Sequence, residues 1–110
     1  MESKIKVIIK RPDEPHGHVT NISQSLKNLQ NTVEGYVESV RISEIPGTEL
    51  LILCNEDGRR LGLEKNCRVC GVDFVGTIIV AGTNGDALGD VPISLKTWRE
   101  MIAEGAEAKS

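Results

Sequence analysis

The sequence predicts a single α+β domain, in which an antiparallel or mixed sheet of about five to six strands carries two packed helices. Three observations support this fold class. Short alternating or continuous apolar stretches, typical of strands, recur along most of the chain. Two other stretches repeat apolar residues every three or four positions, as amphipathic helices do. The strand-like stretches mostly lie between the two helical ones, and this order disfavours a doubly wound parallel sheet.

In the first half of the chain we expect two strands separated by a helix. Residues 4–11 place Ile5, Val7 and Ile9 on one face and lysines on the other, with Ile8 interrupting the alternation, which predicts a strand with one solvent-exposed face. A few extended residues follow at 18–22, and a helix is expected to begin at Ser23 and to end at Gly35. Its apolar stripe consists of Ile22, Leu26, Leu29 and Val33. Residues 36–42 predict the next strand, and a Pro-Gly turn at 45–48 could join it to the following strand as a hairpin.

In the second half, residues 49–54 are almost continuously apolar, which predicts a central strand covered on both faces. The dipeptide Asp57-Gly58 is a hairpin signal, so residues 59–63 are expected to return as a short strand. An irregular segment at 64–71 precedes a strand over residues 72–81, in which Gly76 indicates a bulge or a close backbone approach, and residues 82–90 are expected to form a loop. Ser94 is expected to cap the last helix, which Gly105 should end. The apolar stripe of this helix consists of Leu95, Trp98, Met101 and Ile102.

Length and composition fit one soluble domain, which we assign to residues 1–104, followed by a flexible C-terminal tail at 105–110. The net charge of -3 disfavours non-specific binding to nucleic acid, because phosphate neutralisation dominates that affinity. No apolar stretch is long enough to span a membrane, and the apolar run near the N-terminus is too short for a signal peptide. We therefore expect a cytoplasmic protein that does not contact membranes.

Four segments of the chain together resemble a small domain family of unknown function: KVIIKRPDE, TVEGYVE, LCNEDGRRLGLEKN and FVGTIIVAG. The resemblance spans about residues 4–102, and its most specific part is the Asn-acidic-x-Gly turn followed by Leu-Gly-Leu and a further Asn. Members of that family are common in phages and in mobile elements of Gram-positive bacteria. The resemblance implies a fold and a biological setting but no activity. Cys67 and Cys70 depart from the pattern, which has polar or basic residues there.

The candidate binding site is the one locally basic stretch of the chain, which contains Arg59, Arg60, Lys65 and Arg68. Arginine forks bind phosphate or carboxylate at two points, and asparagines could contact a base or a sugar edge. The candidate ligand-binding residues are Asn55, Arg59, Arg60, Asn66 and Arg68. The alternative is purely structural, with a solvated hairpin strand and with the two asparagines holding turns.

A weaker alternative for the cysteines is a zinc site made of Cys67, Cys70, His16 and His18, four ligands that would suit tetrahedral coordination. A single CxxC pair is a weak signal, so we predict free thiols and no cofactor. Cys54 could be imagined as a nucleophile with either histidine as its base, but a cysteine at the end of a buried strand more often belongs to the core. No catalytic residue is predicted.

These observations favour a non-catalytic binding or interaction module of a phage or mobile element. It would sequester a small anionic ligand or bind a host protein, and interference with host defence is a role that fits the setting. One alternative is a small hydrolase or zinc-dependent enzyme. Another is a structural subunit that forms a homo-oligomer through a sheet edge or through the helix at residues 95–104.

Overall fold

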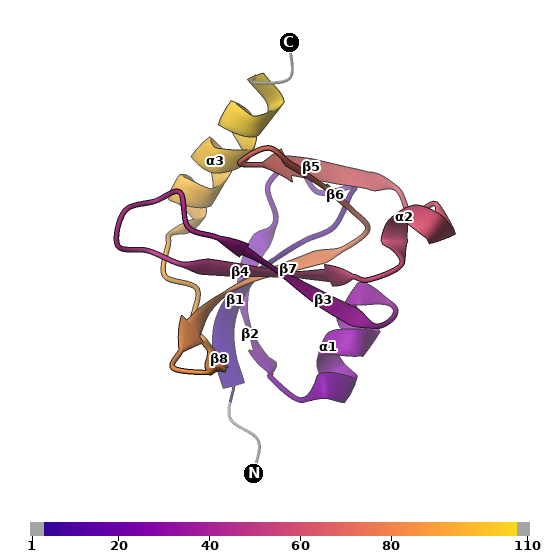
Figure 1. Cartoon of the computed structure of the whole chain (residues 1–110), viewed down its shortest axis with the longest axis horizontal. Coiled ribbons are helices and arrows are strands. Elements are labelled where there is room, and N and C mark those ends of the chain that lie inside the picture. The colour runs from indigo at the N-terminus through magenta and orange to yellow at the C-terminus, as the bar shows by residue number, and fades with distance from the viewer. Residues whose placement is uncertain (1–3, 108–110) are drawn as a thin grey trace.

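The computed structural model describes residues 4–107, which form one six-stranded sheet, one two-stranded sheet and three helices (Figure 1). Every strand pair is antiparallel, so the predicted single α+β domain is confirmed. The elements, in chain order, are β1 (Lys4–Lys10), β2 (His18–Ser23), α1 (Leu26–Val33), β3 (Val37–Ile42), β4 (Leu50–Asn55), α2 (Gly58–Leu61), β5 (Lys65–Val69), β6 (Val72–Val75), β7 (Ile78–Asn84), β8 (Ala87–Gly89) and α3 (Leu95–Glu107).

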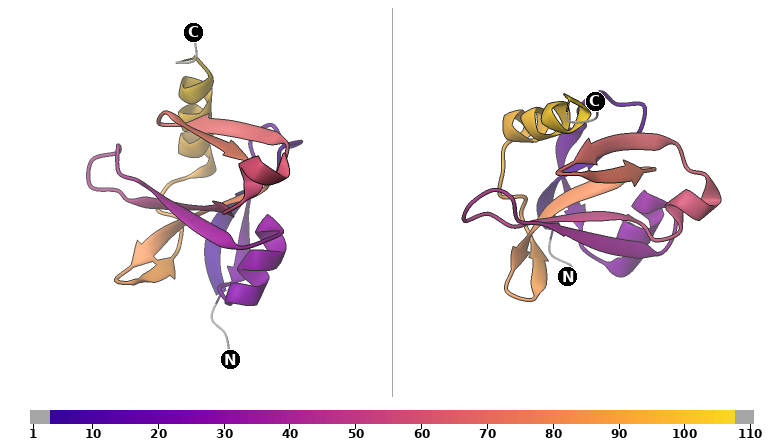
Figure 2. Two further views of the ribbon diagram at one scale, coloured as in Figure 1. Left: turned by 45° about the vertical axis from the view of Figure 1, so that its right-hand side comes forward. Right: turned by 45° about the horizontal axis from the view of Figure 1, so that its top comes forward.

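The large sheet has the strand order β2-β1-β7-β4-β3, with β8 pairing to β7, and it lies between two layers. Helix α1 covers one face, while α3 and the β5–β6 hairpin cover the other (Figures 1 and 2). Each face has its own apolar core, because successive side chains of a strand point to opposite faces. The α1 core includes Val7, Leu29 and Ile79. The core under α3 and the hairpin includes Phe74 and the fully buried Trp98.

Strand β1 shows how this layering departs from the prediction. Ile5, Val7 and Ile9 belong to the α1 core, as the alternation predicts. The opposite face is not solvent-exposed along its whole length, however, because Ile8 is fully buried and Lys10 is only 3% exposed. The expectation of one wet face was therefore wrong beyond Lys6. The cause is non-local, since β5 and α3 pack over the end of β1 that carries Ile8 and Lys10.

Helix α1 buries Leu29 and Val33 as predicted, but Leu26 is 63% exposed. The helix begins at Leu26 instead of near Ser23, because Ser25 is the N-cap and its hydroxyl oxygen accepts from the Asn28 amide at 3.2 Å. The chain leaves the helix at Glu34, which takes the left-handed conformation in place of Gly35 (φ 64°). Glycine is required at position 35 because no side chain fits there: a Cβ would lie 2.5 Å from Nδ2 of Asn55.

The predicted hairpin across the turn at 45–48 is confirmed as β3–β4, but the second one, at Asp57-Gly58, was wrong. Residues 58–61 form the one-turn helix α2 instead of returning as a strand. The sheet topology gives the reason. Strand β4 is already hydrogen-bonded to β3 on one edge and to β7 on the other, so no edge remains for a returning strand.

Four further segments differ from the sequence-based expectation. The segment at 64–71 contains β5, and the strand expected over 72–81 is two strands, β6 and β7, separated at Gly76 and Thr77. The loop expected at 82–90 contains the β7–β8 hairpin. Ser94 does cap α3, because its hydroxyl accepts from the Thr97 amide at 3.1 Å, but the helix continues through Gly105 to Glu107. Of the predicted tail, residues 108–110 lie outside the described part of the chain.

Candidate anion-binding site

Asn66 occupies a bulge in the β5–β6 hairpin. Lys65 pairs with Val75 and Cys67 pairs with Phe74, so Asn66 is the extra residue of β5. A bulge redirects a side chain out of the regular alternation. Here the Asn66 amide donates to the carbonyls of Lys10 at 2.9 Å and Gly76 at 2.7 Å, and its oxygen accepts from Nζ of Lys10 at 2.7 Å. Asn66 thus fastens the hairpin to the end of β1.

Asn55 has the same kind of role at the other end of the candidate stretch. Its Nδ2 donates to the carbonyls of Val33 at 3.2 Å and Glu34 at 3.1 Å, at the C-terminus of α1. Its Oδ1 accepts from the Asp57 amide at 2.8 Å. The side-chain NH2 groups of both asparagines therefore donate to backbone carbonyls. These contacts are the ones expected if the two asparagines hold backbone segments in place. The hypothesis of a bound ligand therefore depends on the arginines.

Replacing Asn55 with alanine is expected to lower the free energy of unfolding by roughly 2–3 kcal/mol, because two carbonyls and one amide lose a buried partner. Urea unfolding followed by circular dichroism measures this. The control is Asn31→Ala, an exposed site within α1, which should leave stability unchanged or slightly higher. Equal effects of the two substitutions would show that the Asn55 contacts contribute nothing.

A cleft of about 590 Å³ opens beside the hairpin, and we call it the β5–β6 cleft. Its apolar surface comes from Leu63, Phe74 and Val75, whereas Arg59, Lys65 and Arg68 bring three positive charges against the single carboxylate of Asp73. The complete lining is Arg59, Leu63, Lys65, Asn66, Cys67, Arg68, Asp73, Phe74 and Val75. The cleft is therefore positively charged and carries an apolar surface.

Two arginines of the cleft lie against β6. Nη2 of Arg59 donates to the Asp73 carbonyl at 2.9 Å. Nε of Arg68 lies 3.9 Å from the Asp73 carboxylate, which is an ion-pair distance but too long for a hydrogen bond, and this buried nitrogen has no hydrogen-bond partner. The Asp73 side chain is itself 61% exposed, so water screens the pair. The positive charge of Arg68 is only weakly compensated.

A second cavity, of about 420 Å³, contains Asn55 and Arg60 but does not suit an anion. Its wall brings together four carboxylates and two arginines, and Arg60 already pairs with Asp57 at 3.3 Å. The carboxylates are those of Glu38, Glu56, Asp57 and Asp73. The predicted site is therefore divided. Arg59, Asn66 and Arg68 line the β5–β6 cleft, Asn55 and Arg60 do not, and sequence proximity had suggested one group.

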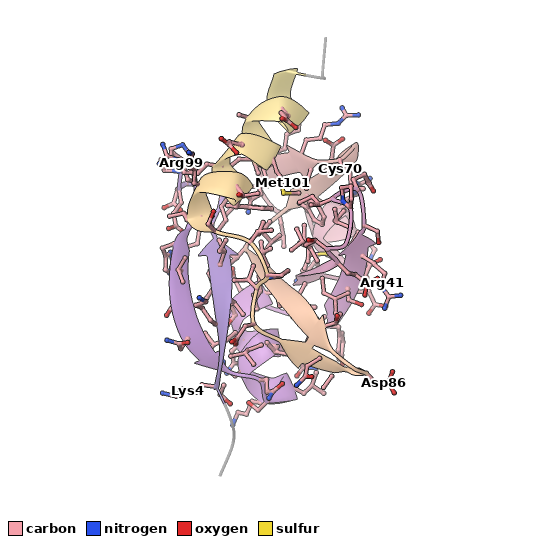
Figure 3. All side chains as sticks on the ribbon, turned by 90° about the vertical axis from the view of Figure 1, so that its left-hand side faces the viewer. Lys4, Arg41, Cys70, Asp86, Arg99 and Met101 are labelled. Carbon is pink, nitrogen blue, oxygen red and sulfur yellow. The ribbon has the colours of Figure 1, made fainter. Side chains whose placement is uncertain are left out.

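The four residues of the zinc alternative are not brought together. His18 lies 2.8 Å from the Glu14 carboxylate, and Cys70 is exposed in the turn between β5 and β6. In Figure 3, Cys70 and Arg99 lie on opposite sides of α3, and Arg99 shares a cavity with His16 and Cys67. Within residues 4–107 no group of three or more His, Cys, Asp or Glu side chains is placed to hold a metal.

Burial raises the pKa of Cys54 to about 11, and it does the same for Cys67. Both thiols are therefore protonated at neutral pH. The cavity beside Cys54 has no histidine in its lining. Sγ of Cys54 lies 3.7 Å from the Glu38 carbonyl. This environment does not activate Cys54 as a nucleophile.

We expect Cys70 to react with an alkylating reagent at least about tenfold faster than Cys54 or Cys67 at pH 8, since it alone is exposed. Burial and the Glu44 carboxylate raise the pKa of Cys70 as well, but the pKa near 11 of Cys54 and Cys67 leaves only roughly one of those thiols in a thousand ionised. Peptide mass spectrometry after timed iodoacetamide treatment measures the three rates. In denaturant the rates should converge. Faster labelling of Cys67 than of Cys70 in the native protein would contradict this order.

Fold and cleft together define a small α+β domain with a basic, partly apolar cleft beside its β5–β6 hairpin. The chain belongs to the family described as a domain of unknown function (DUF3846), whose model matches residues 5–103. No curated protein and no solved structure matches the chain. None of the helices in the described residues has the length and apolar character needed to cross a membrane.

Proposed function

We propose that this protein is a non-catalytic binding module that holds a small amphipathic anion, with an apolar body and one phosphate, carboxylate or sulfonate group, in the β5–β6 cleft. The observation that carries the proposal is the lining itself. The cationic side chains of Arg59, Lys65 and Arg68 line the cleft beside an apolar surface. The only carboxylate in the lining is that of Asp73, which is exposed to water. Guanidinium and ammonium groups bind such anions through charge-assisted hydrogen bonds, and an apolar wall gains free energy from covering the rest of a ligand.

The walls of the cleft are fixed by contacts already in place, which lowers the entropic cost of binding. Asn66 holds β5 against β1, and the Arg59 bond to the Asp73 carbonyl occupies only one of five guanidinium donors. The remaining donors of Arg59 and the ammonium of Lys65 supply the contacts to the anionic group. Leu63 and Phe74 contact its apolar body.

The proposal extends to a biological setting. The sequence resembles a family common in phages and mobile elements of Gram-positive bacteria, and a small domain that sequesters an anionic metabolite or signal in the host cytoplasm fits that setting. The role we assign is removal of the ligand from a host process.

A thermal-shift panel tests the binding. It contains naphthalenesulfonate and the nucleoside monophosphates, each beside its neutral parent, naphthalenemethanol or the nucleoside. At a ligand concentration about tenfold above Kd, a bound anion should raise the Tm by roughly 6 °C for a domain of this size. The neutral parents should raise it much less, because they lack the contact to the cationic side chains.

The variant Lys65→Gln should weaken binding by roughly tenfold, because it removes one charge from the cleft. Its matched control is Lys27→Gln, at an exposed position of α1 on the opposite face of the sheet, which should bind as the wild type does. If no anion of the panel raises the Tm at millimolar concentration, or if the two variants bind equally, the proposal is wrong.

A further inference from the structure

A separate cavity, of about 280 Å³, lies where the end of β1 and the segment after it meet β5 and α3, and we call it the basic cavity. Its polar lining brings together Lys10, His16, Arg68 and Arg99. The other lining residues are Pro15, Asn66, Cys67, Ile102 and Ala103, and none of the nine is acidic. Three cationic groups and an imidazole thus converge from four separate segments of the chain without a counter-charge in the wall.

Lys10 is the most informative member of this cavity. It is 3% exposed, and its ammonium contacts Asn66 Oδ1 at 2.7 Å and the Arg11 carbonyl at 3.4 Å. Among the side chains that the structure describes, no carboxylate pairs with it. Burying an ammonium away from water is unfavourable unless an opposite charge compensates it. An anion in the cavity would supply that charge.

The arginines of the cavity also lack strong partners. The buried Nε of Arg68 has no hydrogen bond, and its ion-pair contact with Asp73 is long. Arg99 is exposed on α3, and within the described residues it forms no ion pair. Burial raises the pKa of the Cys67 thiol to about 11 although Lys10 lowers it, so Cys67 adds no negative charge at neutral pH.

Glu14, an acidic residue of the segment after β1, makes its contacts outside the cavity. Burial raises its pKa, but hydrogen bonds to the Arg11 amide at 2.9 Å and the His18 ring at 2.8 Å outweigh that effect and hold the pKa below its ordinary value. Glu14 is therefore ionised at neutral pH, and its charge is paired with Arg11. It is not part of the cavity wall.

The cavity is also rigidly assembled. Nε1 of Trp98 donates to the His16 carbonyl at 2.9 Å, which ties the segment after β1 to α3. Gly17 has a φ of +91°, and a Cβ there would lie 2.7 Å from the Ile9 carbonyl, so this turn packs directly on β1. Asn66 ties β5 to the same end of β1. Groups held in place before binding lose little conformational entropy when the ligand arrives.

We propose that the basic cavity is a binding site for a phosphate-class dianion, either free inorganic phosphate or a phosphate monoester. Lys10 and the guanidinium of Arg68 contact the anion from the floor, Arg99 closes on it from α3, and His16 supplies a further polar contact. Several cations around one small cavity match a compact, multiply charged tetrahedral anion better than a single carboxylate, and arginine forks suit phosphate oxygens. This site does not depend on the function proposed for the β5–β6 cleft, although Arg68 lines both.

Isothermal titration with inorganic phosphate, at constant ionic strength in chloride buffer, tests the proposal. The wild type should bind one phosphate saturably with a Kd of roughly a millimolar or below. Arg99→Gln should weaken binding by about tenfold or more, since it removes a bidentate cationic contact from an exposed side chain that the fold does not need.

Lys65→Gln serves as the matched control, because Lys65 lines the β5–β6 cleft and not the basic cavity; its affinity for phosphate should stay within about twofold of wild type. Absence of saturable binding, an unchanged affinity of Arg99→Gln, or an equal loss in Lys65→Gln would each overturn the proposal. The same pair separates the two sites, since the amphipathic anion of the cleft should respond to Lys65 and not to Arg99.

A second arm of the titration uses glycerol 3-phosphate, which carries the same anionic group on a neutral body. Tighter binding of the ester than of inorganic phosphate identifies a phosphorylated metabolite as the source of the ligand. Equal or weaker binding of the ester identifies free phosphate. Binding of neither compound overturns the site.

Discussion

Replacing Asn66 with alanine is expected to lower the free energy of unfolding by roughly 3–5 kcal/mol, a large share of the stability of a domain this size. The substitution removes the best acceptor of the buried Lys10 ammonium. It also leaves the carbonyls of Lys10 and Gly76 without the donor that connects β5 to β1. Each buried polar group that loses its partner adds its own desolvation penalty.

Urea unfolding of Asn66→Ala measures this effect, with Asn21→Ala as the control because Asn21 is exposed on the edge strand β2. The control should change stability by less than about 0.5 kcal/mol. A loss below about 1 kcal/mol in Asn66→Ala would mean that the hairpin is held by its apolar contacts alone.

Arg68→Met is expected to have opposite effects on binding and on stability. Both proposed sites should lose affinity by roughly tenfold to a hundredfold, because the guanidinium of Arg68 lines the cleft and the basic cavity alike. The free energy of unfolding should stay unchanged or rise by up to about 1 kcal/mol, since a weakly paired, partly buried cation beside Lys10 is replaced by an apolar side chain.

The two effects are measured by titration of naphthalenesulfonate and phosphate and by urea unfolding of the ligand-free protein. The control is Arg41→Met, because Arg41 is an exposed arginine that pairs with Glu49 at 3.3 Å and lines neither site. It should leave both affinities unchanged. A clear loss of stability in Arg68→Met would contradict the assignment of Arg68 to binding and would make it a structural residue.

The fold class followed from local periodicity, but the environment of particular residues did not. The alternation of β1 correctly placed Val7 and Ile9 on one face. On the other face, Ile8 is buried in a core that it shares with Trp98, and Lys10 contacts Asn66. Trp98 and Asn66 both lie far along the chain and meet β1 only in the folded domain. A pattern read along one strand carries no information about which distant segment will cover it.

A turn motif in the sequence predicted a hairpin correctly only where the strand before it had a free edge for the returning strand to pair with. Asp57-Gly58 has hairpin chemistry, yet β4 had no unpaired edge and the chain formed α2 instead. The hairpin between β7 and β8 was missed although Gly85-Asp86, the two residues between the paired Asn84 and Ala87, has hairpin chemistry, with glycine at the first turn position and a φ of +65° there.

The candidate site was predicted in part. The basic stretch led to Arg59 and Arg68, both of which line the β5–β6 cleft. The sequence could not divide Arg60 from them, because α2 turns Arg60 toward Asp57 and the acidic cavity. It also gave no reason to join Lys10 and Arg99 to Arg68, since these three residues belong to different elements that converge only through the packing of α3 and β5 on β1.

The central claim is that the β5–β6 cleft binds a small amphipathic anion, and a two-dimensional amide NMR titration with naphthalenesulfonate tests it most directly. We predict saturable shifts concentrated at residues 63–68 and 73–75, with α1 unaffected and with much weaker shifts when naphthalenemethanol replaces the anion. Shifts that do not saturate, that centre on α1 and the opposite face of the sheet, or that are as large with the neutral alcohol would contradict the claim.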